Sequence, residues 1–517
     1  MNKKIIIILI LLLMIVLLFG CFGPEKKPEI PNYKDNVHNP FGVFYGSGNL
    51  GAVKELGAEA RVLVFERIDS PKMMKQMDET MKLNEKETYV SLLFETEERM
   101  FKLTAVGNNK YCLSEGEDRE RSKAFAKKIV ERYDGDNDFG CTIINEKDCY
   151  ENGDALYPSE ELQNAILENP IHYWQIDNEF VYQIRDCSNG KEEEIQVPKE
   201  KMVDYIKEMG AFIKEVDSEA KIITPSFTEF ARVLLLDRRV DYVEWGRDDC
   251  VRTTLTYEDA IEQLNSGSED ALRVKKEIEE AKEYFEYILT ESKDYYDVID
   301  FHDYGNNYYM SEAFAGWMNA LGLGEKDLVS TELGGPFYFY EAIGAPQPTE
   351  CARSGKDDRG PDRYSEAVLS EYVVKNFVIA FNAGIDRVHW ATLTELFDPY
   401  QDNFKRASLL NTDNSKKPAF YTYKLMRQKL DGFVSVREIE DDVYKFVLDD
   451  ERVVMVAWSG GGDKTIDLSE HFASENIEVI HIVTELDSNK EPIYPEDEIV
   501  PKGKVLISEI PIFIEEK

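Results

Sequence analysis

The chain contains eight short apolar segments separated by helical or loop stretches, and this alternation constrains its fold more than any other feature. The eight segments, each expected to form a strand, span residues 41–47, 61–68, 88–96, 172–179, 220–226, 296–305, 327–335 and 385–393. Between them, stretches such as 121–133 and 199–216 carry apolar residues at the 3.6-residue spacing of a helix. Alternating strands and helices form a parallel sheet, and eight such units close a (β/α)8 barrel. The sequence therefore predicts an α/β protein built around a TIM barrel.

The rest of the chain divides into smaller regions. Residues 1–23 are expected to be a signal peptide or anchor, 24–38 a polar linker with prolines, and 39–430 the barrel. An insertion at about 227–296 follows the fifth strand and is expected to lie partly over the barrel mouth, with the charged face of its helix in solvent. Residues 431–517 contain short alternating strands with Asp-Asp and Gly-rich turns, which predict a small β-sandwich packed against the barrel.

The N-terminus has the pattern of an export signal. Two lysines precede fifteen apolar residues at 5–19, a length that suits a signal peptide better than a membrane-spanning helix of roughly 20 residues. Leu18, Gly20 and Cys21 resemble a lipoprotein signal, in which lipid is attached to the Cys21 thiol. An uncleaved membrane anchor is the alternative, because Phe19 stands where a smaller residue is usual. In both cases we expect an exported protein anchored to the outer face of the cell membrane.

Charge and cysteine content bound the possible partners. A net charge of -39, from 100 acidic and 61 basic residues, would repel phosphate backbones, so no nucleic-acid partner is expected. An exported chain can form disulfides, but the spacing does not determine how the cysteines beyond Cys21 would pair. These cysteines are Cys112, Cys141, Cys149, Cys187, Cys250 and Cys351. They form no C-x-x-C pattern and the histidines form no H-x-x-x-H pattern, so no metal is expected.

Polar residues follow several of the predicted strands. In a barrel of this kind the loops that leave the C-terminal strand ends form the active-site face, so the polar residues at those ends should converge. They are Arg67, Asn178, Glu179, His302, Tyr304, Glu332 and Trp390. Two carboxylates that end strands four and seven would then face each other across the barrel mouth.

Seven segments that occur in a fixed order carry a resemblance to a known clan. They are ERYDGDN, IHYWQIDNEF, AKIITPS, VIDFHDYG, LVSTELGGP, HWATLTE and SLLNTDNSKKPAFYTYKLM. Together they resemble the clan of (β/α)8 retaining glycoside hydrolases that includes β-galactosidases, β-xylosidases and cellulases. The resemblance covers roughly residues 40–430, and the C-terminal β region also suits it. It implies an oligo- or polysaccharide substrate, no cofactor, and either hydrolysis or transglycosylation.

The resemblance implies catalytic roles for two glutamates. The Asn-Glu pair that ends strand four in the clan matches Asn178 and Glu179, with Glu179 as the general acid/base. The glutamate that ends strand seven matches Glu332, the nucleophile. Surface carboxylates are the alternative interpretation for both glutamates, and a capping turn residue is the alternative for Asn178.

Four further positions match residues that bind the sugar in the clan. Tyr304 corresponds to the tyrosine that orients the nucleophile, and His302 lines the floor of the site. Trp390 corresponds to the tryptophan that stacks beneath the sugar. Arg67, or alternatively Arg61, corresponds to the arginine of strand two. The alternatives are core packing for Tyr304, His302 and Trp390, and a structural ion pair for Arg67.

The chemistry of glycoside cleavage explains why two carboxyl groups are needed. One must protonate the leaving oxygen while the other, ionised, faces an oxocarbenium-like carbon. A separation of about 5 Å lets the second carboxylate attack directly and gives retention, whereas about 6.5 to 9.5 Å admits a water and gives inversion. The negative charge of Glu332 should raise the pKa of Glu179 so that it donates the proton. The Asn178 amide would bind a sugar 2-hydroxyl.

Two other functions compete with this one. The segment GSGNLG at 46–51 matches a dinucleotide fingerprint, with Glu66 about 20 residues beyond its start. The helix expected after it ends before Gly57, and an exported protein meets no nicotinamide pool, so a tight first barrel turn is the better interpretation and no nucleotide cofactor is expected. A non-catalytic carbohydrate-binding or envelope-scaffold lipoprotein on the same barrel is the second alternative.

Overall fold

The structure is a computed structural model that describes most of the barrel and the whole C-terminal region. The described residues are 40–44, 49–65, 77–78, 81, 89–93, 111–113, 115–136, 150–151, 154–155, 159–178, 184–185, 197–227, 242–245, 252–255, 262, 264–303, 310–335, 366–394 and 408–517. The predicted anchor at 1–23, with Cys21, lies outside them, as do all the predicted disulfide cysteines except Cys112. Within these residues, no helix has the length and apolar character needed to cross a membrane.

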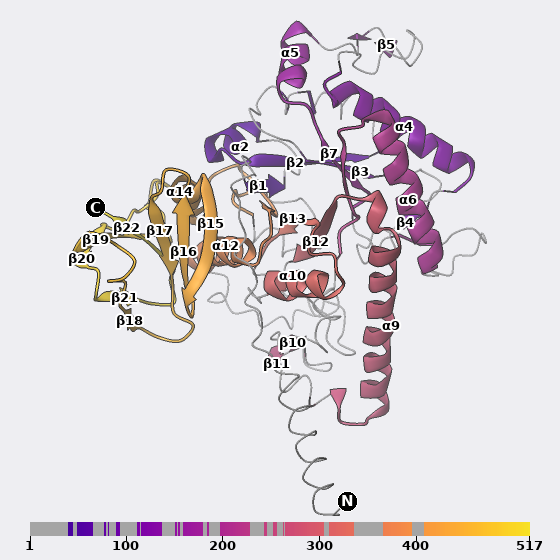
Figure 1. The fold of residues 1–517 in the computed structure, drawn as a ribbon. Helices are drawn as coiled ribbons and strands as arrows, with labels where there is room; N and C mark the ends of the chain where they lie inside the picture. The colour runs from indigo at the N-terminus through magenta and orange to yellow at the C-terminus, as the bar shows by residue number, and fades with distance from the viewer. Residues whose placement is uncertain are drawn as a thin grey trace, which may run out of the picture.

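A closed barrel of parallel strands forms the centre of the fold (Figure 1). Its strands, in chain order, are β1 (Phe41–Phe44), β2 (Glu59–Phe65), β3 (Tyr89–Leu93), β7 (Tyr173–Ile176), β9 (Lys221–Ile223), β12 (Val298–Asp303), β13 (Asp327–Leu333) and β14 (Arg387–Trp390). Each pairs with its predecessor in this series, and β14 pairs with β1 to close the ring. These strands lie within or overlap the predicted segments, so the α/β class and the barrel order are confirmed.

Helices surround this ring. They are α2 (Leu50–Leu56), α4 (Glu117–Tyr133), α5 (Glu160–Glu168), α6 (Lys199–Val216), α9 (Glu269–Glu291), the short 3-10 helix η2 (Lys293–Tyr295), α10 (Met310–Ala320), α12 (Glu366–Asn382) and α14 (Pro418–Leu430). The amphipathic pattern predicted for α6 is confirmed, because Met202, Ile206, Met209 and Ile213 are all buried. Burying such a stripe removes apolar area from water and fixes each helix on the barrel.

The helix α2 is the one that follows the glycine-rich GSGNLG segment. The Asn49 side chain caps it by accepting a hydrogen bond from the Ala52 amide at 3.1 Å. Gly57 ends it in the left-handed conformation, with φ of 62°, which a residue with a Cβ adopts only under strain. The resulting helix has 7 residues. This short element agrees with the prediction of a first barrel turn.

The insertion after strand five contributes one long helix and one hairpin to the described residues. Strands β10 (Tyr242–Trp245) and β11 (Arg252–Leu255) pair antiparallel. Helix α9 lies in the outer helix layer, where the Phe285 ring meets those of Phe227 at 5.1 Å and Trp317 at 6.4 Å between centroids. Its opposite face is in solvent and carries the exposed ion pair of Arg273 with Glu277. The predicted solvated face is confirmed, whereas α9 itself packs beside the barrel rather than over its mouth.

Alternation along β12 separates the barrel interior from the helix layer. Ile299 and Phe301 point outward, and the Phe301 ring lies 4.5 Å from that of Phe314 in α10. Val298 belongs to a separate buried cluster with residues of β7, β9 and β13, which meet only inside the ring. Because strand side chains alternate, Asp300 and His302 share the inward face with Val298. Two polar side chains therefore enter the barrel from a single strand.

The C-terminal region is antiparallel β structure on one side of the barrel (Figure 1). Its main sheet has the order β15 (Phe433–Glu440), β16 (Val443–Leu448), β17 (Val453–Ala457), β22 (Ile512–Glu516), β19 (Asn476–His481), β20 (Glu498–Pro501). Strands β18 (Lys464–Ile466) and β21 (Val505–Ile507) form a second, two-stranded sheet that shares an apolar cluster with the first. Phe433 packs on Phe381 of α12, with ring centroids 5.0 Å apart. An all-β region packed on the barrel is thus present, while its description as a β-sandwich stays a prediction.

Four small strands complete the described elements. Strand β4 (Tyr111–Cys112) pairs in parallel with β8 (Ile184–Arg185). Strand β5 (Tyr150–Glu151) pairs antiparallel with β6 (Asp154–Ala155). None of these pairs belongs to the ring of barrel strands.

Candidate active site

Four of the predicted site residues are described, and these four lie at or just after the C-terminal ends of barrel strands. Glu332 is the next-to-last residue of β13 and His302 the next-to-last of β12. Asn178 comes two residues after β7, and Trp390 is the last residue of β14. The remaining predicted residues, Arg67, Glu179 and Tyr304, lie outside the described residues, and Arg61 is described only as part of β2.

Glu332 and His302 lie side by side on neighbouring strands. They are register partners between β12 and β13, and His302 Nδ1 lies 3.7 Å from Glu332 Oε2. Both side chains are buried, with 2 % of His302 and 4 % of Glu332 exposed. The structure therefore brings the predicted nucleophile and the predicted floor residue into direct contact at the barrel's active-site end.

A β-bulge gives Glu332 this position. Between the register pairs Asp300–Val329 and His302–Glu332, β13 contains one residue more than β12. The pairing of β13 with β14 shifts at the same place. Without the extra residue, strict alternation would turn Glu332 away from the face that Val329 shares with the interior. Bulges commonly re-aim side chains next to active sites, and this one directs Glu332 toward the barrel axis.

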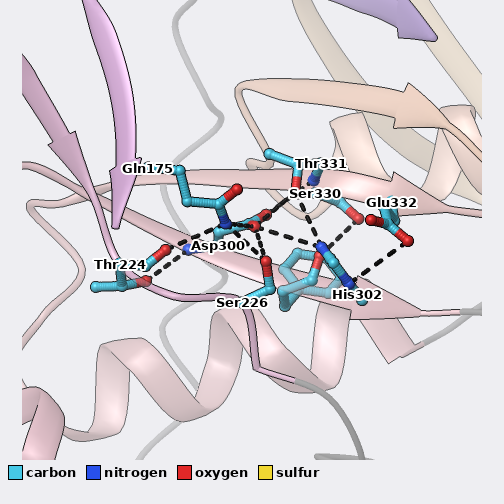
Figure 2. Close-up of polar contacts among 9 residues, drawn as sticks. Gln175, Thr224, Ser226, Asp300, His302, Ser330, Thr331 and Glu332 are labelled. Atoms are coloured by element: carbon cyan, nitrogen blue, oxygen red, sulfur yellow. Dashed lines mark hydrogen bonds and ion pairs between the residues drawn. The ribbon is translucent and has the colours of Figure 1, made fainter. Parts of the chain in front are cut away.

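A buried aspartate lies behind this pair, as Figure 2 shows. The Asp300 side chain has no solvent exposure and accepts hydrogen bonds from three neighbours. Gln175 Nε2 and the Ser226 hydroxyl donate to Oδ2. Thr331 donates twice, from its amide to Oδ1 at 2.8 Å and from its hydroxyl to Oδ2 at 2.6 Å. These donors come from β7, from β13 and from the residues after β9, so Asp300 of β12 connects all of these segments.

The Thr331 hydroxyl connects Asp300 to His302. Its oxygen lies 3.0 Å from His302 Nε2, while His302 Nε2 and Asp300 Oδ2 are 3.6 Å apart. The Thr331 hydroxyl donates to Asp300 Oδ2, so its oxygen is free to accept from His302 Nε2 in the tautomer that carries the ring proton there. The second ring nitrogen, Nδ1, then faces Glu332. We call the set of Gln175, Ser226, Asp300, His302, Thr331 and Glu332 the Asp300 network.

The end of β7 is held in an unusual backbone conformation. Asp177 has a φ of 59°, in the left-handed region that few non-glycine residues adopt. The Tyr205 hydroxyl of α6 donates to its carboxylate, and the Ser226 amide donates to the Asn178 carbonyl at 2.6 Å. These contacts fix the exit of the strand that leads to Glu179. The Asp177 side chain therefore has a partner in the helix layer.

Trp390 has the packing of a core aromatic. Its side chain is fully buried and stacks on Phe377 of α12, with ring centroids 6.3 Å apart and the planes inclined by 24°. It is also the register partner of Leu333, the residue after Glu332, and both lie on the helix-facing side of the barrel. Core packing was the alternative interpretation of Trp390, and we do not include this residue among those proposed to bind the sugar.

Sequence reasoning missed the residues behind Glu332. Asp300 and Thr331 precede the strand-end positions from which the site was predicted, and Ser226 ends the fifth predicted segment, which contributed no predicted site residue. A signal for Asp300 was present in the segment VIDFHD, since an acid two positions before His302 in an apolar strand must share its face. No comparable signal existed for Thr331, whose contacts depend on the bulge.

A separate group of acids lies at the other end of the barrel. Glu131, Asp134 and Asp136, at the end of α4, have carboxylate oxygens within 4.8 Å of one another, an arrangement that could hold a metal ion. Burial raises the pKa of Asp134 to about 8, with the charges of Asp136, Asp217 and Glu131 adding to the effect. The amide of Ile171, two residues before β7, donates to the Tyr133 carbonyl at the end of α4 at 2.8 Å. This contact places the acids near the start of β7. The group is therefore remote from Glu332 and separate from the candidate active site.

The fold is similar to those of solved glycoside hydrolases. A family 39 glycoside hydrolase from the gut symbiont Bacteroides cellulosilyticus WH2 matches 93% of this chain and 81% of its own, with a TM-score of 0.54 and 12% identity. An α-L-arabinofuranosidase from Thermotoga maritima matches 95% of this chain and 97% of its own, with a TM-score of 0.48 and 10% identity. No protein-family model and no curated protein sequence matches the chain. The resemblance to barrel glycoside hydrolases is thus confirmed at the level of the fold.

Proposed function

We propose that the protein is a retaining glycoside hydrolase that cleaves O-glycosidic bonds in oligo- or polysaccharides. The observation that carries the proposal is the placement of Glu332 by the β13 bulge, with its carboxylate beside His302 at the C-terminal end of the barrel. A carboxylate held there, behind the loops that form the active-site face of such barrels, suits a nucleophile. The similarity of the fold to glycoside hydrolases adds support.

The proposed reaction has two steps. A Glu332 oxygen attacks the anomeric carbon and forms an ester, while the glycosidic oxygen leaves with the proton of Glu179. Water then attacks the same carbon, gives a proton to Glu179 and releases Glu332 as the carboxylate. Two inversions at one carbon give net retention. Asn178, Tyr304 and Arg67 are proposed to bind and orient the sugar.

A test of the nucleophile uses a panel of nitrophenyl glycosides with the full chain. We expect turnover of at least one substrate, loss of that turnover in Glu332→Ala, and partial recovery with azide, which replaces the missing carboxylate. The matched control is Glu325→Ala, an exposed glutamate in the turn before β13 that should leave turnover unchanged. Binding of the sugars without turnover would instead favour a carbohydrate-binding protein.

A second measurement locates the covalent bond. A 2-fluoro glycoside slows the second step, so the sugar should remain attached to the enzyme as an ester. Peptide mapping is expected to find it on Glu332, and a sugar on any other acid would contradict the assignment. The anomer released from a normal substrate, followed by NMR, tests retention directly.

We also propose that residues 1–23 export the protein and tether it to the outer face of the membrane, through lipid on Cys21 or through an uncleaved anchor. Support comes from the lysines and the apolar run at 5–19. Expression of the full chain in a bacterial host should place it in the membrane fraction. Cys21→Ser should release it from that fraction if the anchor is a lipid and should have no effect if the anchor is the apolar segment.

A further inference from the structure

Asp300 is a buried aspartate whose side chain has no solvent exposure. It is hydrogen-bonded to Thr331, the residue before the proposed nucleophile Glu332. Burying a carboxylate is costly unless donors replace the water that it loses. Asp300 accepts from Gln175, Ser226 and both donors of Thr331, which offsets this cost. An apolar residue would fill the same space without needing four donors. The polar arrangement therefore calls for an explanation beyond packing.

We propose that Asp300 is a positioning residue for Glu332, acting through the bulge residue Thr331 and through His302. The inference rests on the proposed function, because it assigns Asp300 a role in presenting the nucleophile. Two links carry it, one through the backbone of β13 and one through the histidine ring, and Figure 2 shows both.

The backbone link holds the bulge. A bulged residue loses its regular ladder partner, so its amide needs another acceptor. The Thr331 amide finds it in Asp300 Oδ1 at 2.8 Å, and the Thr331 hydroxyl binds Oδ2 of the same carboxylate at 2.6 Å. Glu332 is the next residue, so the direction of its side chain follows from how Thr331 is held.

The histidine link affects which nitrogen of the His302 ring carries a proton. Because the Thr331 hydroxyl donates its hydrogen bond to Asp300, the Thr331 oxygen is left to accept from His302 Nε2 at 3.0 Å. With Nε2 donating to Thr331, Nδ1 faces Glu332 Oε2 at 3.7 Å and attracts that carboxylate only when it also carries a proton. Gln175 and Ser226 hold Asp300 from the opposite side, and the Gln175 amide also donates to the Ser226 hydroxyl at 2.7 Å. Rotation of Asp300 would therefore break contacts on two strands.

Two substitutions separate these links from general packing. Asp300→Asn replaces one acceptor oxygen with a donor and so opposes a donor that now binds it. Thr331→Val removes only the hydroxyl and keeps the amide link to Asp300. The matched control is Ser330→Ala, which also removes one buried hydroxyl from β13, the one bound to the Phe301 carbonyl at 2.9 Å on the outward side.

The first readout is kinetic. We expect kcat to fall by about 10²-fold in Asp300→Asn and about 10-fold in Thr331→Val, with KM changed less than threefold, because misplacing a reacting group by about 1 Å can cost about 10²-fold. Ser330→Ala should retain kcat within about twofold. If Asp300→Asn does not fold, Thr331→Val decides alone. Unchanged kcat in Thr331→Val, or an equal loss in Ser330→Ala, would overturn the proposal.

The second readout does not depend on activity. Nitrogen NMR of the protein labelled with ¹⁵N-histidine distinguishes protonated from unprotonated ring nitrogens, and the His302 signals are assigned by their loss in His302→Gln. We expect a proton on Nε2 in the parent and in Ser330→Ala, and a changed pattern in Thr331→Val. The same pattern in Thr331→Val as in the parent would overturn the histidine link. If the parent shows the expected pattern but turns over no glycoside and takes no 2-fluoro label, the proposed function fails while the histidine link holds.

Discussion

The two ends of the barrel interior both bury charge, but they do so in different ways. At the N-terminal end, Arg387, Glu59 and Tyr173 are the first residues of β14, β2 and β7. Arg387 lies 4.5 Å over the Tyr173 ring and 3.9 Å from a Glu59 oxygen, although β14 and β7 are on opposite sides of the ring. At the C-terminal end, the Asp300 network leads through Thr331 to a carboxylate at a strand end.

The two arrangements differ in which charged groups they bring together. The N-terminal cluster pairs a cation with an anion and an aromatic face, so the charges meet one another across the barrel. In the Asp300 network, His302 lies between two acids, Asp300 and Glu332, and Glu332 is at the C-terminal end of β13. One end of the barrel is therefore expected to serve stability and the other chemistry. Substitutions that separate activity from stability can break or sharpen this division.

The largest effect is expected for Glu332→Gln. The amide keeps the size of the side chain but does not attack carbon, so kcat should fall on the order of 10⁵-fold, as when a nucleophile is removed from other covalent enzymes. The free energy of unfolding should stay the same or rise, because functional carboxylates are rarely placed for stability. Kinetics and urea unfolding on the same preparation test both. A loss of about 3 kcal/mol in the free energy of unfolding would mean that Glu332, too, serves stability.

The reverse pattern is expected for Glu59→Gln. This change removes the Glu59 charge beside the Arg387 guanidinium, and breaking one side of a buried pair typically costs about 3 kcal/mol or more. The free energy of unfolding should fall by that amount while kcat stays within about twofold, because Glu59 is at the far end of the barrel. Urea unfolding measures the first and glycoside turnover the second. A large drop in kcat with unchanged stability would reverse the assignment of the two ends.

A pH effect on stability is expected at the N-terminal end through Asp386. Burial, with the charge of Asp327 nearby, raises the pKa of Asp386 from 3.8 to about 7. Because the folded pKa is above the unfolded one, this group favours the folded state most below about pH 4, and the contribution is lost as pH rises through 7. Asp386→Asn removes the titration while its side-chain oxygen still accepts from the Leu328 amide.

Unfolding by urea at several pH values measures the Asp386 effect. Between pH 5 and 8, the stability of Asp386→Asn should rise relative to that of the parent protein. The control is Asp413→Asn, since a hydrogen bond from the Ser415 hydroxyl is the main cause that lowers the pKa of Asp413 to about 2. Its difference from the parent should change only below about pH 4. Parallel curves for Asp386→Asn and the parent would contradict the prediction.

The sequence was sufficient for the barrel and insufficient for the inside of the site. Strand order followed from eight apolar segments, because alternating strand and helix leaves few arrangements. The sequence alone did not show which side chains of a strand face the barrel interior. His389 and Trp390 are both fully buried, so no contrast of polar and apolar residues marks the face of β14. The outward position of Trp390 depends on its pairing with Leu333, beyond the bulge.

The bulge also explains why the route from Asp300 to Glu332 was not predicted. Regular alternation along β13 places Thr331 and Val329 on one face and Glu332 on the other. The extra residue lets Thr331 reach Asp300 while Glu332 still pairs with His302. A one-residue irregularity has no period of its own and leaves no pattern in a single sequence. The order of the motifs predicted Glu332, whereas the contacts that hold it depend on a bulge that the sequence does not reveal.

The smallest effect is expected for Tyr173→Phe, and it tests the division most finely. The Tyr173 hydroxyl accepts a hydrogen bond of 3.4 Å from Arg387, and phenylalanine loses this bond but keeps the ring beneath the guanidinium. Stability should fall by about 0.5 to 1 kcal/mol. Combined with Glu59→Gln, the two losses should not add, because both act on Arg387. Turnover should remain at the parent value. If this single hydroxyl, opposite β14 and far along the barrel from Glu332, changes kcat more than twofold, the N-terminal cluster influences the chemistry, and the two ends must be treated as one coupled interior.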